Sequence, residues 1–310
     1  MNAPVPKFTV LVGLPASGKS TWAEKKAAES NNTEVFSSDA LRKELYGDES
    51  TQGDPNIIFT TLKGRIKQCL LAGKNAILDA TNVSRKNRVS FMQEFKNIPC
   101  EKNCVVFIVP MKTLTERNSN RKRVVPEMVI NRMLLQYCPP HKGEGFDNIH
   151  YKFDEACEWF TDDNVISLMR GFDQKNSHHT LDLLSHCEKA RDIVVEVVGS
   201  DDEVLSTAAL FHDCGKVYTQ TAVNAKGIDD GNYHYYSHQN VSAYIASMVA
   251  HNMGYNDEKI SRLCNIIYLH MCPYLDWKSS EKALNKSLQI VGQSIVSDVY
   301  VLHTADEEAH

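Results

Sequence analysis

The stretch Gly13-Leu14-Pro15-Ala16-Ser17-Gly18-Lys19-Ser20 decides how the first half of the chain folds. Its two glycines have four residues between them and are followed by Lys and Ser, which is the pattern of a phosphate-binding loop. The apolar run 10–12 before it predicts the end of a buried strand, and the residues from Thr21 onward predict a helix. A chance glycine-rich turn would not require this strand–loop–helix context. We therefore expect the loop to bind a nucleotide.

The fixed residues of this loop each have a chemical role. Gly13 and Gly18 let the backbone curl so that several N–H groups face one anion, and the helix N-terminus adds partial positive charge. Lys19 supplies a full charge to the β- and γ-phosphates, and the hydroxyl of Ser20 can ligate Mg²⁺. The expected cofactors are ATP, or another nucleoside triphosphate, and Mg²⁺. The predicted nucleotide-binding residues of the loop are Gly13, Ser17, Gly18, Lys19, Ser20 and Thr21.

Length and composition restrict the class of protein. A chain of 310 residues favours two domains, and a net charge of −5 provides no global basic field for nucleic acid. No apolar run reaches transmembrane length and the first residues lack an apolar signal core, so we expect no membrane partner. The nine cysteines are scattered without a Cys-x-x-Cys pair. Reduced thiols in the cytoplasm of a bacterial or phage-infected cell are the expectation.

The first half alternates strands and helices. This order predicts an α/β fold in which a parallel sheet is covered by helices on both faces. Ligands of such sheets lie beyond the carboxyl ends of the strands, where the loop, Asp39 and Asp79 are all expected. The predicted strands are 7–12, 34–37, 75–78 and 104–109, and the predicted helices include 57–71, 114–120 and 126–136.

Two carboxylates follow strand ends, and each has two interpretations. Asp39 and Arg42 share a helix face, and Asp39 could accept the proton of an attacking hydroxyl or simply cap the helix. Asp79 could belong to the Mg²⁺ shell, or it could fix a turn with Thr81 and Asn82.

Arg117 and Arg121 lie four residues apart on one predicted helix face. Like charges at this spacing repel, so an anion is expected to compensate them. A lid that brings guanidinium groups onto transferring phosphates would do so. A solvated basic face is the alternative.

These motifs together resemble the kinase domain of phage-type 5′-hydroxyl polynucleotide kinases, over residues 7–160. The resemblance rests on Gly13–Trp22, Ser-Ser-Asp39-Ala-Leu-Arg42, Leu-Asp79-Ala-Thr-Asn and Arg117-Asn-Ser-x-Arg121. It implies that Asp39 is the general base for the 5′-hydroxyl, that Arg42 contacts the acceptor phosphate, and that Arg117 and Arg121 contact the donor phosphates. With Lys19, these form the predicted catalytic set of the kinase. The role of Arg123 stays open, because the stretch before Pro126 is shorter than in that family.

The residue composition of the chain changes after residue 160. The polar, turn-rich segments 161–164 and 171–177 indicate a linker. We therefore predict a kinase domain at 1–165, a linker at 166–178 and a second domain at 179–310. From residue 179 on, apolar periodicity predicts an all-α domain. Its predicted helices include 193–198, 205–211, 241–249, 260–269 and 288–301.

Histidine is concentrated in this second half. Four of its histidines sit in or beside predicted helices, Asp213 directly follows one of them, and Asp298 lies in the last helix. A lone histidine on an apolar face is usually a satisfied core residue. An adjacent His–Asp pair after an apolar run is costly to bury, however, and a first-row divalent metal would offset that cost. The four histidines are His186, His212, His238 and His270.

This pattern resembles the HD phosphohydrolase superfamily over residues 176–305. Phe-His212-Asp213-Cys-Gly-Lys216 carries the resemblance, together with the segments around His186 and His238. The resemblance implies one or two divalent transition metal ions, Mn²⁺, Fe²⁺, Ni²⁺, Co²⁺ or Zn²⁺. It also implies that Lys216 contacts a phosphate, although a surface lysine at a helix end is the alternative. The implied ligands are His186, His212, Asp213 and Asp298 for the first ion, and His238 and His270 for the second.

The two resemblances imply a bifunctional enzyme that heals nucleic-acid ends. One half would phosphorylate a 5′-hydroxyl, and the other would open a 2′,3′-cyclic phosphate or remove a 3′-phosphate. The expected partners are RNA or DNA ends, with tRNA among them, and a separate RNA ligase that acts downstream. Two alternatives remain: a nucleoside or small-molecule kinase fused to an HD nucleotidase, and a non-catalytic nucleotide-binding switch.

Overall fold

The computed structural model describes residues 5–175 and 181–309. The chain divides into two compact units, Met1–Met133 with Glu144–Asp154, and Leu134–Gly143 with Glu155–His310. Residues 134–143 and 155–165, which we expected in the first domain, therefore belong to the second unit, as do positions 166–175 of the predicted linker. The last three linker positions and the expected domain start at His179 lie outside the described residues. Each unit is considered by itself below.

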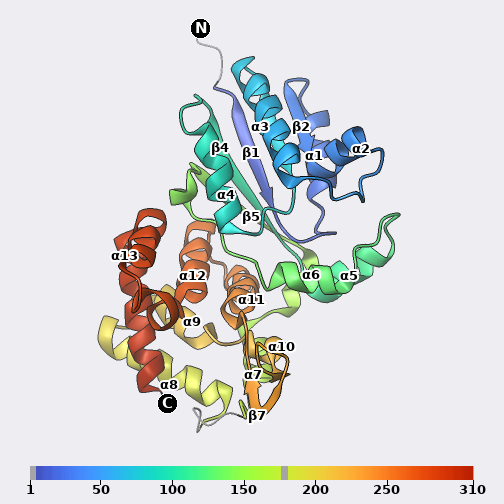
Figure 1. Cartoon of the computed structure of the whole chain (residues 1–310). Helices are drawn as coiled ribbons and strands as arrows, with labels where there is room; N and C mark the ends of the chain where they lie inside the picture. Colours follow the sequence, from blue (N-terminus) through green and yellow to red (C-terminus); the bar gives the residue numbers. More distant parts are fainter. Residues whose placement is uncertain (1–4, 176–180, 310) are drawn as a thin grey trace. The chain divides into compact units, whose positions relative to one another are not determined.

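The first unit is built on a parallel sheet, as predicted, and this sheet has five strands in the order β2-β3-β1-β4-β5 (Figure 1). The sequence did not reveal the edge strand β5, in which only Ile149 and Tyr151 are buried. Its elements are β1 (Lys7–Val12), α1 (Lys19–Ala28), β2 (Thr33–Ser37), α2 (Ser38–Tyr46), α3 (Pro55–Leu71), β3 (Asn75–Asp79), α4 (Arg85–Met92), the 3₁₀ turn η1 (Gln93–Phe95), β4 (Glu101–Ile108), α5 (Met111–Ser119) and β5 (Asn148–Phe153). Helix α6 (Glu127–Leu134) and the 3₁₀ turn η2 (Lys142–Glu144) span the unit boundaries.

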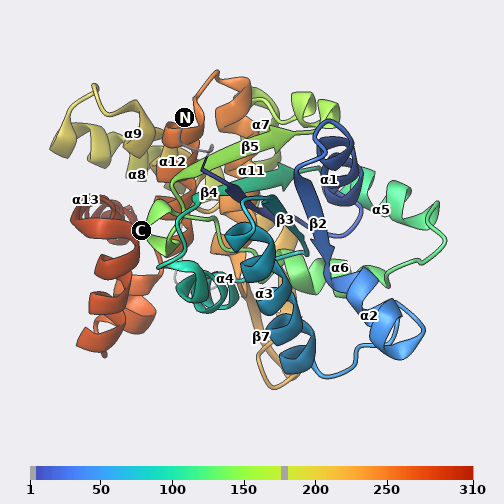
Figure 2. The same ribbon diagram turned by 90° about the horizontal axis from the view of Figure 1, so that it is seen from above.

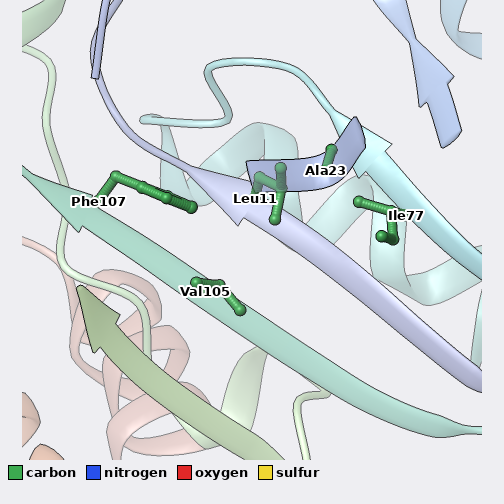
Figure 3. Packing of buried hydrophobic residues seen from close by; sticks show 5 residues of the cluster. All are labelled: Leu11, Ala23, Ile77, Val105 and Phe107. Carbon is green, nitrogen blue, oxygen red and sulfur yellow. The ribbon is translucent and has the colours of Figure 1, made fainter. Parts of the chain in front are cut away.

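Helices cover both faces of this sheet. The chain moves one way along the sheet from β1 to β2 and returns through β3 to β4, so right-handed crossovers place the connecting helices on opposite faces. Helix α1 lies on one face, and α3 and α4 lie on the other (Figure 2). Beneath α1, Ala23 packs on Leu11, Ile77, Val105 and Phe107, which come from three neighbouring strands (Figure 3). This packing fixes the start of α1 at the end of β1.

A buried ion pair joins Arg88 of α4 to Glu144. Arg88 is 2% exposed, and its Nε and Nη2 lie 2.7 and 2.8 Å from the two carboxylate oxygens of Glu144. Its Nη1 also donates to the main-chain oxygens of Asn82 and Val83. Removing one partner would leave the other charge buried and uncompensated, which typically costs 3–5 kcal/mol. The pair therefore holds residues 82–83, just after β3, to the segment that leads into β5.

The second unit is helical, as expected, and a two-stranded hairpin is added to it. Twelve buried positions on α11 make this helix the centre of the unit, and small residues such as Ala243 and Ala246 let its neighbours approach closely. Side-chain caps from Asp182, Asp202 and Asn256 begin three of the other helices. Its elements are the 3₁₀ turn η3 (Glu155–Trp159), α7 (Asp162–Met169), α8 (Leu183–Val198), α9 (Glu203–Phe211), α10 (Lys216–Thr219), β6 (Thr221–Val223), β7 (Asp229–His234), α11 (His238–Asn252), α12 (Asp257–Leu269), the π-helical turn η4 (Pro273–Trp277) and α13 (Glu281–Glu308).

Two further observations concern the chain as a whole. Within residues 5–175 and 181–309, no helix combines the length and the apolar character that crossing a membrane requires. All nine cysteines are free thiols, and most are buried.

Candidate nucleotide and metal sites

The loop between β1 and α1 requires its two glycines for different reasons. A Cβ atom on Gly13 would lie 2.9 Å from Ser17 Oγ and 3.0 Å from the main-chain oxygen of Phe107, so close packing excludes any larger residue. Gly18 has φ 88°, in the left-handed region that favours glycine. Gly18 is also the N-cap of α1 and provides no side-chain cap. The N–H groups at the start of α1 are therefore available to an anion.

Lys19 is buried within this loop. Its Nζ donates to the main-chain oxygen of Leu14 at 2.7 Å and to Ser17 Oγ at 3.2 Å. Burial lowers the pKa of Lys19 to about 8, and the positive charge of Arg121 acts in the same direction, while Asp79 and Asp39 oppose it. The charge of Arg121 therefore acts at the position of the Lys19 ammonium.

Ser20 and Asp79 are joined by a hydrogen bond. Ser20 Oγ donates to Asp79 Oδ2 at 2.7 Å, although the two residues are 59 positions apart. A hydroxyl and a carboxylate together are oxygen ligands that suit Mg²⁺. The turn interpretation of Asp79 is not supported, because Asn82 instead donates to the main-chain oxygens of Leu11 and Ala80.

Asp39 lies near the start of α2 between two arginines. Arg42 Nη1 is 2.6 Å from Asp39 Oδ1, and Arg123 Nη1 is 3.4 Å from Asp39 Oδ2. The helix cap is Ser37, whose hydroxyl oxygen accepts from the N–H of Ala40. Asp39 is therefore not the N-cap, and its side chain is 46% exposed. The contact with Arg123 was not predicted, because this residue lies in the irregular segment after α5.

Arg117, the other predicted lid residue, is engaged elsewhere. Its Nη2 lies 2.7 Å from Oδ2 of Asp154, directly after β5. The two arginines that we expected on one lid face therefore have different surroundings. Arg121 lowers the pKa of Lys19, whereas Arg117 forms an ion pair with Asp154. A role for Arg117 in binding phosphate stays a prediction.

Six side chains of the second unit converge in two clusters that share Asp213. In each cluster the candidate ligand atoms all lie within 4.8 Å of one another. His186 comes from α8, His212 and Asp213 directly follow α9, His238 begins α11, and His270 directly follows α12. The first cluster is His186, His212, Asp213 and Asp306, and the second is Asp213, His238 and His270.

Asp213 bridges the clusters because its two oxygens face different histidines. Oδ1 lies 3.0 Å from His238 Nε2 and 3.7 Å from His270 Nε2. Oδ2 lies 3.5 Å from His212 Nε2 and 3.8 Å from His186 Nε2. A carboxylate shared in this way suits two adjacent cations.

Three of the histidines are held in the tautomer that a metal requires. The Nδ1 atoms of His212, His238 and His270 lie 2.6–2.8 Å from main-chain oxygens three residues earlier. In a neutral imidazole, donation to those oxygens leaves Nε2 as the lone-pair nitrogen that a cation would bind. Burial lowers the pKa of His212, but Asp213 raises it well above its usual range. The Nε2 atoms of His238 and His270 are only 3.2 Å apart, and buried His212 Nε2 makes no hydrogen bond within the described residues. Inward-facing lone pairs of this kind fit a bound cation.

The charges of the cluster also fit metal ligation. Burial lowers the pKa of His270 to about 3, and His212 and His238 act in the same direction, so this imidazole is neutral. Burial would raise the pKa of Asp213, but Lys216 and His212 hold it well below its usual range. Lys216 is 6% exposed and its Nζ lies 2.6 Å from Asp213 Oδ2. The surface-lysine interpretation of Lys216 is therefore wrong.

One predicted ligand must be corrected. Asp298 does not join the cluster: it lies 3.0 Å from Arg262 Nε, and Arg262 also binds Asp202. Asp306, two turns later on α13, takes the place, with Oδ1 2.9 Å from His186 Nε2 and 3.4 Å from His212 Nε2. Residues eight apart lie on similar sides of a helix but about 12 Å apart along it, so the sequence pattern alone does not choose between them.

Gly215 serves close packing rather than a special turn. Its φ of −69° is open to any residue. A Cβ atom there would lie 2.5 Å from the main-chain oxygen of His238 and 2.6 Å from the nitrogen of Ser242. Gly215 N–H also donates to Ser242 Oγ at 2.8 Å. The absence of a side chain thus lets the His–Asp turn lie directly on α11.

Comparison with known families agrees with this division of the chain. Residues 8–140 match the AAA domain family, and residues 177–298 match the HD domain family. The chain therefore combines a P-loop kinase-type domain with an HD domain, which confirms the combination expected from the sequence. P-loop kinase domains use a nucleotide together with Mg²⁺, and HD domains bind divalent metal ions. The HD match ends at residue 298, eight positions before Asp306.

Individual relatives cover part of the chain. An L-seryl-tRNA(Sec) kinase of Methanococcus maripaludis is 30% identical over 150 residues, which are 44% of this chain and 55% of that protein. The chain thus spans about half the length of this curated relative. A solved structure of the Pnkp1/Rnl/Hen1 RNA repair complex matches with 24% identity, 43% coverage of this chain and 44% of that one, and a TM-score of 0.39. A putative kinase from Chloroflexus aurantiacus matches with 16% identity, 48% and 89% coverage, and a TM-score of 0.38.

Proposed function

We propose that the first unit is a polynucleotide 5′-hydroxyl kinase. The observation that carries this proposal is the position of Asp39 between Arg42 and Arg123. A general base needs only a carboxylate, so the two guanidinium groups call for an anionic acceptor. A polynucleotide end supplies one, because a phosphate adjoins the reacting nucleoside.

The remaining kinase residues have defined tasks in this proposal. Lys19 and Arg121 neutralise the donor phosphates, and Ser20 and Asp79 would hold Mg²⁺. Asp39 accepts the proton of the 5′-hydroxyl. The relative named L-seryl-tRNA(Sec) kinase supports an acceptor that is attached to RNA for this half of the chain.

The second unit is proposed to be a metal-dependent phosphoesterase. His186, His212, Asp213 and Asp306 would hold one ion, and Asp213, His238 and His270 would hold a second. Two divalent ions so placed supply Lewis acidity and an activated water for attack on phosphorus. Lys216, buried beside Asp213, offers a positive charge to the phosphate.

Together the two activities would heal broken RNA. Cleavage that leaves a 2′,3′-cyclic phosphate and a 5′-hydroxyl produces two ends that a ligase cannot join. The first unit would phosphorylate the 5′ end, and the second would open the cyclic phosphate or remove a 3′-phosphate. A separate RNA ligase would then act on the product. The competing function is a nucleoside kinase fused to an HD nucleotidase, for which the net charge of −5 is a weak argument.

One experiment tests both halves. A 5′-hydroxyl RNA oligonucleotide with a 2′,3′-cyclic phosphate is incubated with ATP and with Mg²⁺ or Mn²⁺, and both ends are analysed. Wild type is expected to modify both ends, Lys19→Ala only the 3′ end, and Asp213→Ala only the 5′ end. A mononucleoside is offered in parallel. Preference for the mononucleoside would support the competing function, and loss of both activities in either folded variant would contradict two independent sites.

A further inference from the structure

Gln174 lies in the segment between α7 and α8, where the sequence predicts only a linker. Its side chain is nevertheless buried, with 1% exposure. The hydroxyl of Tyr235 donates to the main-chain oxygen of Gln174 at 2.5 Å, and Gln220 Nε2 donates to that hydroxyl at 2.8 Å. This part of the predicted linker is therefore anchored within the second unit.

The amide of Gln174 has a defined orientation. Lys216 Nζ donates to Gln174 Oε1 at 2.8 Å and pairs with Asp213 Oδ2 at 2.6 Å. A lysine ammonium is only a donor, so the amide oxygen must face it and the amide nitrogen must face away. Lys216 therefore connects Gln174 to Asp213, the carboxylate that the two metal clusters share.

The amide nitrogen of Gln174 lacks an acceptor. Nε2 is buried and makes no hydrogen bond in the part of the chain that the structure describes. Leaving a buried donor unsatisfied costs roughly 1–3 kcal/mol, and native proteins rarely retain such groups without a reason. The ammonium of Lys216 beside it makes an anionic oxygen the favoured acceptor.

We infer that Gln174 is a phosphate-binding residue of the HD site, whose amide nitrogen donates to a non-bridging oxygen of the substrate or product phosphate. Lys216 supplies the charge, and Gln174 fixes the orientation of the same phosphate. This inference rests on the proposed phosphoesterase function of the second unit. It makes Gln174, a residue of the predicted linker, part of the site.

The Gln174→Glu variant separates this role from a structural one. Glutamate keeps the side-chain length and keeps an acceptor for Lys216, so a residue that merely holds Lys216 would tolerate the change. It replaces the donor by an anionic oxygen, which repels phosphate. Calorimetric titration of metal-loaded protein with inorganic phosphate is expected to show at least tenfold weaker binding in Gln174→Glu. The KM for a cyclic-phosphate substrate should rise in parallel, with metal content unchanged.

Two further variants complete the test. Gln174→Met, which keeps the apolar volume but lacks both polar atoms, should also weaken phosphate binding, and it decides the question if Gln174→Glu does not fold. Gln293→Glu is the matched control, because Gln293 is exposed on α13 and its Nε2 donates to Ser297 Oγ, outside the network that anchors Gln174. It should bind phosphate like wild type.

The outcomes distinguish this inference from the function on which it rests. Unchanged phosphate affinity in folded, metal-loaded Gln174→Glu would overturn the role of Gln174. Phosphate binding that depends on Gln174, in a protein that hydrolyses no phosphoester, would retain this role and reject the phosphoesterase. Metal-loaded wild type that binds no phosphate would overturn the inference directly.

Discussion

Arg123 reaches the candidate general base of the first unit: its Nη1 lies 3.4 Å from Oδ2 of Asp39. Arg42 holds the other oxygen of the same carboxylate at the shorter distance of 2.6 Å. The longer contact is the weaker of the two. In the proposed kinase reaction, an acceptor that carries its own phosphate would displace Arg123 from Asp39 and gain a guanidinium partner by doing so.

The first prediction concerns Asp39→Asn. Asparagine retains the shape of the side chain but cannot take a proton, so the kinase rate is expected to fall by about 10²-fold or more. Stability should change little, because Ser37 caps α2 and a half-exposed ion pair contributes only about 0–1 kcal/mol. Phosphoesterase activity in the same preparation is the control for correct folding. Near-normal phosphorylation of a 5′-hydroxyl oligonucleotide would rule out Asp39 as the base.

The pKa of Lys19 predicts how nucleotide binding depends on pH. Burial lowers that pKa to about 8, and nucleotide phosphates favour the protonated ammonium. Affinity should therefore be nearly constant below about pH 7 and fall as the pH rises through 8, by about tenfold between pH 7 and pH 9. Calorimetric titration with Mg²⁺ and a non-hydrolysable ATP analogue at constant ionic strength measures this. Lys19→Arg, which stays charged, should bind with little dependence on pH over this range, and identical profiles for the two proteins would refute the assignment.

Asp306 and Asp298 form a matched pair for testing the metal ligands. Asp306→Asn removes a carboxylate within 2.9 Å of His186 Nε2, so metal content measured by elemental analysis should fall. Asp298→Asn should retain the metal and lose only the ion pair with Arg262, a change of about 1 kcal/mol in stability. The opposite result would return Asp298 to the ligand set.

Gly215→Ala is expected to disturb the metal centre through packing alone. The new Cβ would lie 2.5 Å from the main-chain oxygen of His238, so α11 or the His–Asp turn must shift. Overpacking of this kind typically costs about 1–3 kcal/mol, and scanning calorimetry should show it together with weaker metal retention. Gly64→Ala is the control, since a Cβ there meets nothing within 4 Å and alanine favours the helix α3. An unchanged metal content and melting profile for Gly215→Ala would contradict the packing argument.

The sequence predicted those features that local chemistry encodes. Gly13 and Gly18 with Lys19 and Ser20 predicted the loop, and the predicted strands cover four of the five strands in the sheet of the first unit but neither strand of the β6–β7 hairpin. The edge strand β5 was not predicted, because it is not a continuous apolar run: only alternate residues in it are buried.

Features that depend on distant pairing could not be predicted. The contact between Arg123 and Asp39 joins an irregular segment to α2, and no local pattern marks it. The choice of Asp306 over Asp298 depends on how far α13 extends past its neighbours, and a helical repeat does not contain that information. The polar neighbours of Gln174 predict that it lies in a linker. It is buried instead, in contact with Tyr235 and Lys216, which are more than forty residues away in the sequence.

The path of the chain between the two compact units limits how the protein can be taken apart. The chain leaves the first unit after Met133, returns at Glu144 and leaves again after Asp154, so a single cut cannot produce two intact halves. A fragment that starts at residue 166 would lack Asn240's acceptor, the main-chain oxygen of Tyr137. A cut after Asp154 would keep both segments of the first unit together but would separate residues 134–143 from the rest of the second unit. An engineer who wishes to move the HD half alone must carry residues 134–143 and 155–165 with it.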